Sequence, residues 1–172
     1  MSYGKGLDLI LPAIQELSPE IQKQLLVLFL GNGKLKSQLQ QQADILPHTQ
    51  VHFLGFQNQR QLSNYYHAAD MVILPSRYSE TWGLVVNEAL HHGLPCIVSQ
   101  SVGCAPDLVK PGVTGDIFVT DDASSLAQTI ENSLCLCQEP KFSEQCQLQV
   151  SHYSVDAAAA GIAKAYNLVC ST

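Results

Sequence analysis

Short apolar runs alternate with amphipathic stretches along most of this chain. The runs with the length of a buried strand lie at residues 25–30, 51–54, 71–75, 95–99 and 116–119. Helices are expected around them at 7–17, 34–43, 59–69, 83–92, 126–134, 141–150 and 155–169. Strands that alternate with helices at this length favour parallel strands joined by right-handed crossovers. The pattern therefore predicts an α/β fold, a Rossmann-like open parallel sheet with helices on both faces.

The last third of the chain adds helices rather than strands. Asp121 or Asp122 is expected to cap the helix through 126–134, because an aspartate side chain accepts from the free N–H groups of a helix start. The final helix is rich in alanine, and we expect it to pack along an edge of the domain or against a neighbouring domain.

Composition limits the possible partners. The 172 residues, 46% apolar and 14% charged, suffice for one folded domain over residues 1–172. A net charge of −6 without a run of Lys or Arg argues against nucleic acid or an anionic membrane surface as the main partner. Any phosphate site must therefore be local, built from backbone groups and a few cations.

The expected cellular location and the redox state of the cysteines follow from two further features. No signal peptide is visible, and the longest apolar run, 25–30, is too short to span a bilayer. Cys135, Cys137 and Cys146 could gather around a metal, but the first two point to different faces of a helix. We expect reduced cysteines in a cytoplasmic protein, and peripheral contact with a membrane stays open.

Two glutamates flank the start of the helix expected at 83–92. The loop before this helix follows a buried strand, and ligands of open α/β sheets bind outside the carboxyl ends of the strands. The N–H groups of Gly83, Leu84 and Val85 would lack intrahelical acceptors and would attract a phosphate. Glu88 lies about one turn further in, roughly 5–7 Å at ~1.5 Å per residue, where it could accept both hydroxyls of a ribose. Glu80, ahead of the helix, would meet the group on the far side of the diphosphate.

A nucleotide-sugar has this order of parts: ribose, diphosphate, sugar. The alternative is that a glutamate in the first turns only favours the helix dipole, by about 0.3–1 kcal/mol. Trp82 either stacks on the ligand or packs beneath the loop, and Arg77 is expected to be a solvated loop residue.

Glycines recur where the predicted strands end. Glycine permits close approach of the backbone to a ligand, although tight turns after strands use glycine in any case. One cation and one acid stand among these glycines. The residues expected on this rim are Lys5, Gly31, Gly33, Gly55, Glu80, Gly83 and Gly103.

An ordered series of short motifs resembles a known family. In order, the chain carries Leu54-Gly55-Phe56, Ala69-Asp70, Leu74-Pro75-Ser76, Glu80-Thr81-Trp82-Gly83-Leu84, Glu88-Ala89-Leu90, Gly93-Leu94-Pro95, Gly103, Pro106-Asp107, Gly112 and Gly115. The series resembles the C-terminal, donor-binding domain of the group 1 retaining glycosyltransferases, which have the GT-B fold of two Rossmann domains. The resemblance covers residues 5–135.

The resemblance implies two catalytic residues. Glu80 corresponds to the first acid of the family's paired-glutamate motif, which contacts hydroxyls of the donor sugar. Lys5, in its Lys-Gly pair, corresponds to the cation that neutralises the departing diphosphate. The expected reaction transfers a sugar from a nucleoside-diphosphate sugar to an acceptor hydroxyl with retention of anomeric configuration.

The resemblance also implies a set of substrate-binding residues. Glu88 would hold the ribose, and Gly55 with Phe56 would line the pocket of the nucleobase. The other implied contacts are the segment along the sugar and diphosphate and the turn near the nucleotide, that is Trp82, Gly83, Leu84, Val85, Gly31 and Gly33. No Asp-x-Asp is present, so we expect neither an obligatory divalent metal nor a cofactor besides the donor substrate.

The chain departs from the family pattern in three places. It begins without the strand ending in Gly-Arg that precedes the Lys-Gly pair, and without the N-terminal domain that binds the acceptor. Cys104 stands where the family has a small, glycine-like residue. We therefore expect this chain alone to be inactive as a transferase. The alternatives are a nucleotide-sugar-binding module without transferase activity and a non-hydrolysing sugar-nucleotide epimerase.

Overall fold

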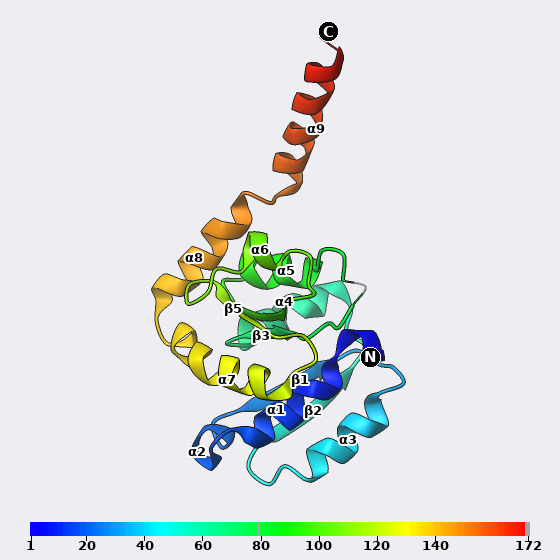
Figure 1. The fold of residues 1–172 in the computed structure, drawn as a ribbon, viewed down its shortest axis with the longest axis vertical. Coiled ribbons are helices and arrows are strands. Elements are labelled where there is room, and N and C mark those ends of the chain that lie inside the picture. Colours follow the sequence, from blue (N-terminus) through cyan, green and yellow to red (C-terminus); the bar gives the residue numbers. More distant parts are fainter. Residues whose placement is uncertain (79, 171–172) are drawn as a thin grey trace.

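The computed structural model describes residues 1–78 and 80–170 as parallel strands surrounded by helices (Figure 1). The strands are β1 (Leu26–Leu30), β2 (Gln50–Gly55), β3 (Val72–Leu74), β4 (Cys96–Ser99) and β5 (Gly115–Phe118). The α-helices are α1 (Ile10–Glu16), α2 (Pro19–Gln22), α3 (Lys36–Asp44), α4 (Gln59–Ala68), α5 (Leu84–His91), α6 (Ala105–Leu108), α7 (Ala123–Ser133), α8 (Pro140–Ser151) and α9 (Val155–Cys170). Short 3-10 helices are η1 (Tyr3–Lys5), η2 (Leu7–Leu9) and η3 (Leu134–Cys137).

The strands are parallel, as predicted, but they form two sheets. β1 pairs with β2, and β4 lies between β3 and β5. Among the described residues no strand ladder joins β1 to β3. The expected sheet is thus divided between its second and third strands in chain order.

The predicted cover of helices on both faces is confirmed by the core around β4. Successive strand residues point to opposite faces. Ile97 accordingly belongs to an apolar cluster with α1 and α7, whereas Cys96 and Val98 belong to a second cluster with α5 and α8. All four residues of β4 are buried, so this strand lies at the centre of the packed part of the chain.

Capping side chains set several helix starts. Asp122 caps α7, its carboxylate accepting from the N–H of Ser125 at 2.9 Å, which selects it over Asp121. Asn58 caps α4 in the same way through the N–H of Gln61 at 3.0 Å. The short helix α6 lies where only a turn-rich loop was expected, because Pro106 occupies its first turn, where a proline is tolerated.

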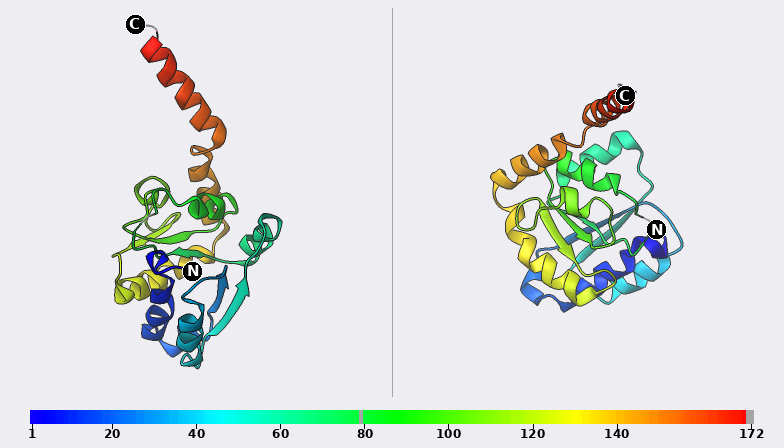
Figure 2. Two further views of the ribbon diagram at one scale, coloured as in Figure 1. Left: turned by 90° about the vertical axis from the view of Figure 1, so that its right-hand side faces the viewer. Right: turned by 45° about the horizontal axis from the view of Figure 1, so that its top comes forward.

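The final helix differs from its expected packing. α9 projects from the body of the protein in both views (Figures 1 and 2), and every residue of it is exposed. The expectation that it packs along an edge of this domain is therefore wrong, and packing against a neighbouring domain stays a prediction. Among the described residues, no helix is both long and apolar enough to cross a membrane.

Candidate functional site

The loop after β3 brings the two predicted catalytic residues together. The Glu80 carboxylate accepts from the Lys5 ammonium group in an ion pair and from the Ser76 hydroxyl at 3.3 Å, both at Oε2. The Lys5 side chain is 47% exposed and that of Glu80 only 16%. The cation is thus open to solvent, while the acid is fixed against the protein.

The N-terminal segment reaches this loop through its own backbone. The N–H of Arg77 donates to the carbonyl oxygen of Gly4 at 2.9 Å. Gly6 has a φ of 64°, and a Cβ added there would overlap the carbonyl oxygen of Pro75. The Lys5-Gly6 pair is therefore required locally, because only a glycine after the lysine lets the segment lie flat against the loop.

Arg77 holds the same segment and contradicts the expectation of a solvated arginine. Its guanidinium binds both oxygens of Asp8 at 2.8 and 2.9 Å, the Tyr3 carbonyl oxygen at 2.9 Å and the Asp121 carboxylate at 2.6 Å. The side chain is only 7% exposed, and hydrogen bonding to Asp8 raises the pKa of Arg77. Asp8 is 69 positions away in sequence, so no local pattern signalled this pair.

Glycine at two positions shapes the start of α5. Gly83 caps the helix with a φ of 105°, and a Cβ there would lie 3.1 Å from Val102 Cγ1. A Cβ at Gly103 would overlap the Thr81 carbonyl oxygen, and the Gly103 N–H donates to the Glu80 carbonyl at 3.0 Å. The loop before α5 is therefore held by the loop after β4.

The first turn of α5 is open to solvent. Leu84 and Val85 begin the helix with exposed side chains, and their N–H groups precede the first intrahelical acceptors. Cys104, where the resemblance expects a smaller residue, is buried under Gly83, and burial raises the pKa of its thiol to about 11. The thiol is therefore neutral and serves as packing.

Glu88 lies in the second turn of α5 and is bonded from α4. The Tyr66 hydroxyl donates to Glu88 Oε2 at 2.8 Å. Burial and the Glu88 carboxylate raise the pKa of Tyr66. This hydrogen bond joins two helices and has no signal in the sequence.

The Trp82 side chain packs beside α5 and near Tyr153. Its indole N–H donates to Asn87 Oδ1 at 2.7 Å, and its ring lies 5.7 Å from that of Tyr153. The Trp82 carbonyl oxygen accepts from the N–H of Cys104 at 2.9 Å. Trp82 thus fixes the loop, and a shallow hollow beside it is lined in part by Leu84 and Tyr153.

The predicted residues at the ends of β1 and β2 form a second group. Gly31 and Gly55 have φ values of 103° and 69° and are joined by a hydrogen bond of 2.6 Å. Gly33 packs against the backbone of Met1, whose ammonium group donates to the Asn32 carbonyl oxygen at 2.6 Å. The N-terminal segment therefore connects this group to the Lys5 loop. Phe56, at the end of β2, is 78% exposed.

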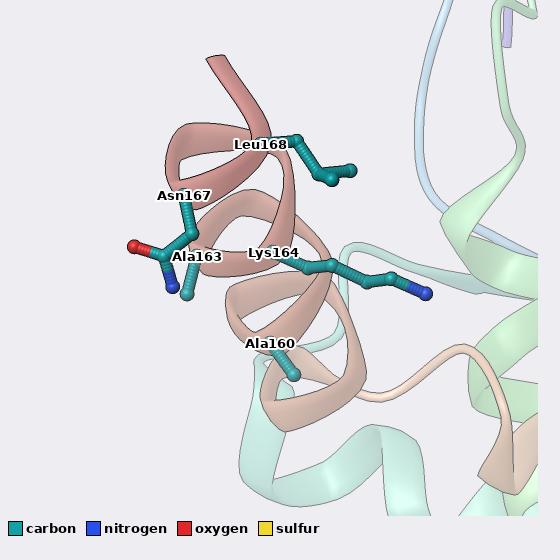
Figure 3. Close-up of a pocket in the computed structure, with 5 residues that line it drawn as sticks. All are labelled: Ala160, Ala163, Lys164, Asn167 and Leu168. Carbon is teal, nitrogen blue, oxygen red and sulfur yellow. The ribbon is translucent and has the colours of Figure 1, made fainter. Parts of the chain in front are cut away.

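Potential metal ligands and other hollows also bear on the site. Among the described residues, no group of three or more His, Cys, Asp or Glu side chains could hold a metal ion. The independence from metals stays a prediction. A hollow along α9 is lined by Ala160, Ala163, Lys164, Asn167 and Leu168 (Figure 3). All five come from one projecting helix, so this hollow is separate from the loops above.

The chain is similar in sequence to known proteins. A family model described as glycosyl transferases group 1 matches residues 1–149. Over 91 residues the chain is 38% identical to the D-inositol 3-phosphate glycosyltransferase of Mycobacterium tuberculosis, a match covering 53% of this chain and 18% of that one.

Solved structures share the fold. A structure of Anabaena Alr3699/HepE in complex with UDP and glucose is 25% identical, with a TM-score of 0.79, over 97% of this chain and 46% of that one. A glycosyltransferase from Rickettsia africae is 16% identical, with a TM-score of 0.80, over 99% and 46%. The chain thus spans less than half of these solved proteins, and its matched region covers less than a fifth of the curated relative.

Proposed function

Because this chain belongs to the group 1 glycosyltransferase family, we propose that it binds the nucleoside-diphosphate sugar from which a sugar is transferred. Glu88 binds the ribose, the first turn of α5 and Lys5 bind the diphosphate, and Glu80 binds the sugar. One observation carries the proposal: the Lys5–Glu80 pair lies beside the open start of α5, with Glu88 in its second turn. Positive groups and two acids thus come together around the start of α5, which supports the binding of a nucleotide-sugar.

Electrostatics support the role of Lys5. As the bond from the anomeric carbon to the diphosphate breaks, the leaving oxygen gains negative charge. The Lys5 ammonium group and the N–H groups at the start of α5 stabilise that charge without reorganisation. Removal of one such preorganised donor commonly raises a barrier by about 3–4 kcal/mol. These groups supply the positive charge that a divalent metal supplies elsewhere, so we propose a reaction without an obligatory metal.

Glu80 is assigned to binding rather than to nucleophilic attack. Its Oε2 atom is held by Lys5 and Ser76, which fixes the carboxylate as an acceptor for sugar hydroxyls. The acceptor oxygen then bonds to the anomeric carbon on the face from which the diphosphate leaves, and the leaving phosphate oxygen takes the acceptor proton. This front-face path retains the anomeric configuration. The acceptor is bound by a further domain. The similar solved protein is longer than this chain and has enough residues for such a domain.

Uridine diphosphate is the first nucleotide to test, because the Anabaena structure contains UDP and glucose. Isothermal titration calorimetry on the folded chain is expected to detect UDP binding. Glu88→Ala should raise the Kd about tenfold or more, because hydrogen bonds to a charged group are worth about 1.5–3 kcal/mol each.

The matched control is Glu131→Ala. Glu131 is an exposed glutamate of α7, so its loss changes the net charge by the same amount without touching the loops around α5. Its Kd for UDP should equal that of the wild type. A folded wild-type chain that binds none of the uridine, guanosine and adenosine diphosphates contradicts the proposal.

A further inference from the structure

Helix α4 contributes a residue to the site that neither the family motifs nor the sequence patterns single out. The Tyr66 hydroxyl, on α4, donates to Glu88 Oε2, on α5, at 2.8 Å. Among the described residues, no other side chain forms a hydrogen bond or an ion pair with the Glu88 carboxylate. The orientation of the Glu88 carboxylate therefore depends on α4.

Tyr66 is itself held in place from α5. Its ring stacks on that of His92, with ring centroids 5.0 Å apart and planes 27° apart. His92 Nδ1 lies 2.8 Å from the Glu88 carbonyl oxygen, and Nε2 lies 3.0 Å from the Ser63 hydroxyl of α4. Because a carbonyl oxygen only accepts, Nδ1 carries the hydrogen. These contacts close a ring between α4 and α5.

The hydrogen bond from Tyr66 uses only part of the capacity of the Glu88 carboxylate to accept hydrogen bonds. A carboxylate has two oxygens with about four acceptor sites. Tyr66 occupies one site on Oε2, and Oε1 has no protein donor among the described residues. Burial and the Glu88 charge keep the Tyr66 hydroxyl protonated by raising its pKa, so that it donates throughout the neutral range. Glu88 thus keeps one oxygen fixed and the other free.

We propose that Tyr66 is a positioning residue that orients Glu88 to accept the 2′ and 3′ hydroxyls of a ribose. Through this orientation α4 makes the site selective for ribonucleotides over nucleotides without those hydroxyls. The inference rests on the proposed function, because it assumes that Glu88 binds the ribose. Tyr66 itself contacts Glu88 and no part of the ligand.

The test compares two nucleotides and two tyrosines. Tyr66→Phe keeps the ring and its stacking on His92 and removes only the hydroxyl. By calorimetry it should raise the Kd for UDP by up to about tenfold, less than Glu88→Ala does, because the carboxylate is still present but no longer oriented. It should leave the Kd for 2′,3′-dideoxy-UDP unchanged, because that nucleotide has no hydroxyl for Glu88 to bind.

Tyr65→Phe is the matched control. Tyr65 is the preceding residue of α4 and is also half-buried, but its hydroxyl has no hydrogen bond among the described residues. It should leave both Kd values unchanged. In a Glu88→Ala background, Tyr66→Phe should have no further effect on UDP, because the group it orients is gone.

Three results overturn the inference. Equal weakening of UDP and dideoxy-UDP by Tyr66→Phe means that the hydroxyl supports the fold of the site in general. An unchanged Kd for UDP means that Glu88 needs no orientation. A wild-type chain that binds none of the uridine, guanosine and adenosine diphosphates removes the proposed function, and this inference with it, whereas the first two results leave the proposed function standing.

Discussion

At the scale of single residues, Gly83 meets two separate demands. Its φ of 105° is costly for any residue with a Cβ. A Cβ there would also lie 3.1 Å from Val102 Cγ1 and 3.3 Å from Leu74 Cδ2, which is tighter than usual packing. The start of α5 therefore depends on a glycine for both its backbone conformation and its packing.

Gly83→Ala should lower the free energy of unfolding by about 2–3 kcal/mol, the sum of backbone strain and crowding. Gly112→Ala is the control, because Gly112 has a φ of 70° with no heavy atom near an added Cβ, and it should cost only about 1 kcal/mol. Urea unfolding followed by circular dichroism measures both. Equal losses would mean that crowding at Gly83 adds nothing.

The sequence predicts the place of a residue where the topology of the chain alone brings that residue to the site. Lys5, Glu80 and Gly83 stand beside predicted strand ends, so their meeting at the loops follows from the topology. The partners of Arg77 and the hydroxyl bond of Tyr66 did not follow. Both join residues far apart in sequence, and such contacts depend on how helices and loops are packed rather than on local period.

At the scale of elements, the short N-terminal segment depends on a loop for its position. Residues 1–9 carry Lys5 and are fixed to the loop after β3 largely by Arg77. The pair of Arg77 with Asp8 is nearly buried, with exposed fractions of 7% and 12%. Loss of one partner from such a pair leaves the other charge without compensation.

Arg77→Met should therefore lower the free energy of unfolding by about 3 kcal/mol, measured by urea unfolding. Lys141→Met provides the contrast, because its ion pair with Glu139 is exposed on both sides, and it should change stability by less than about 1 kcal/mol. Similar effects of the two substitutions would show that the Arg77 network does not stabilise the segment.

The strands and long helices were predicted nearly to their ends, because continuous apolar runs and a period of 3.6 residues are visible in the sequence. The 3-10 and four-residue helices were missed, since they are too short to establish a period. The position of α9 was also missed. An alanine-rich sequence indicates that a helix can pack, but it does not indicate which surface the helix packs against.

At the scale of the whole molecule, the chain has a packed body and a projecting helix. α8 contributes the buried residues Cys146 and Val150 to the core with α5, whereas α9 contributes none. The boundary between body and projection therefore lies at about residue 154.

A chain ending at Ser154 should unfold with the same free energy as the full chain, within about 0.5 kcal/mol, because no buried side chain is lost. A chain ending at Glu139 loses α8 as well, and it should be destabilised by several kcal/mol, at about 1.5–3 kcal/mol for each buried side chain. Urea unfolding distinguishes them. A large loss on removing α9 alone would show that this helix folds back onto the body.

The divided sheet also fits a larger pattern. In the doubly wound fold the strand order is 3-2-1-4-5-6, with the first strand in the middle. If β1 and β2 are the second and third strands and β3, β4 and β5 the fourth to sixth, the first strand would lie between β1 and β3. The family resemblance expects a strand ahead of Lys5 in this place, and that expectation stays a prediction.

The division between β1 and β3 has a consequence for handling the protein. Each of these strands has one edge without a sheet partner among the described residues, and free edges are templates for pairing with another chain. At high concentration, the free strand edges of two copies can pair with each other. We expect such pairing to lead to aggregation rather than to a defined dimer. The free edges of β1 and β3 therefore bear directly on the solubility of the protein.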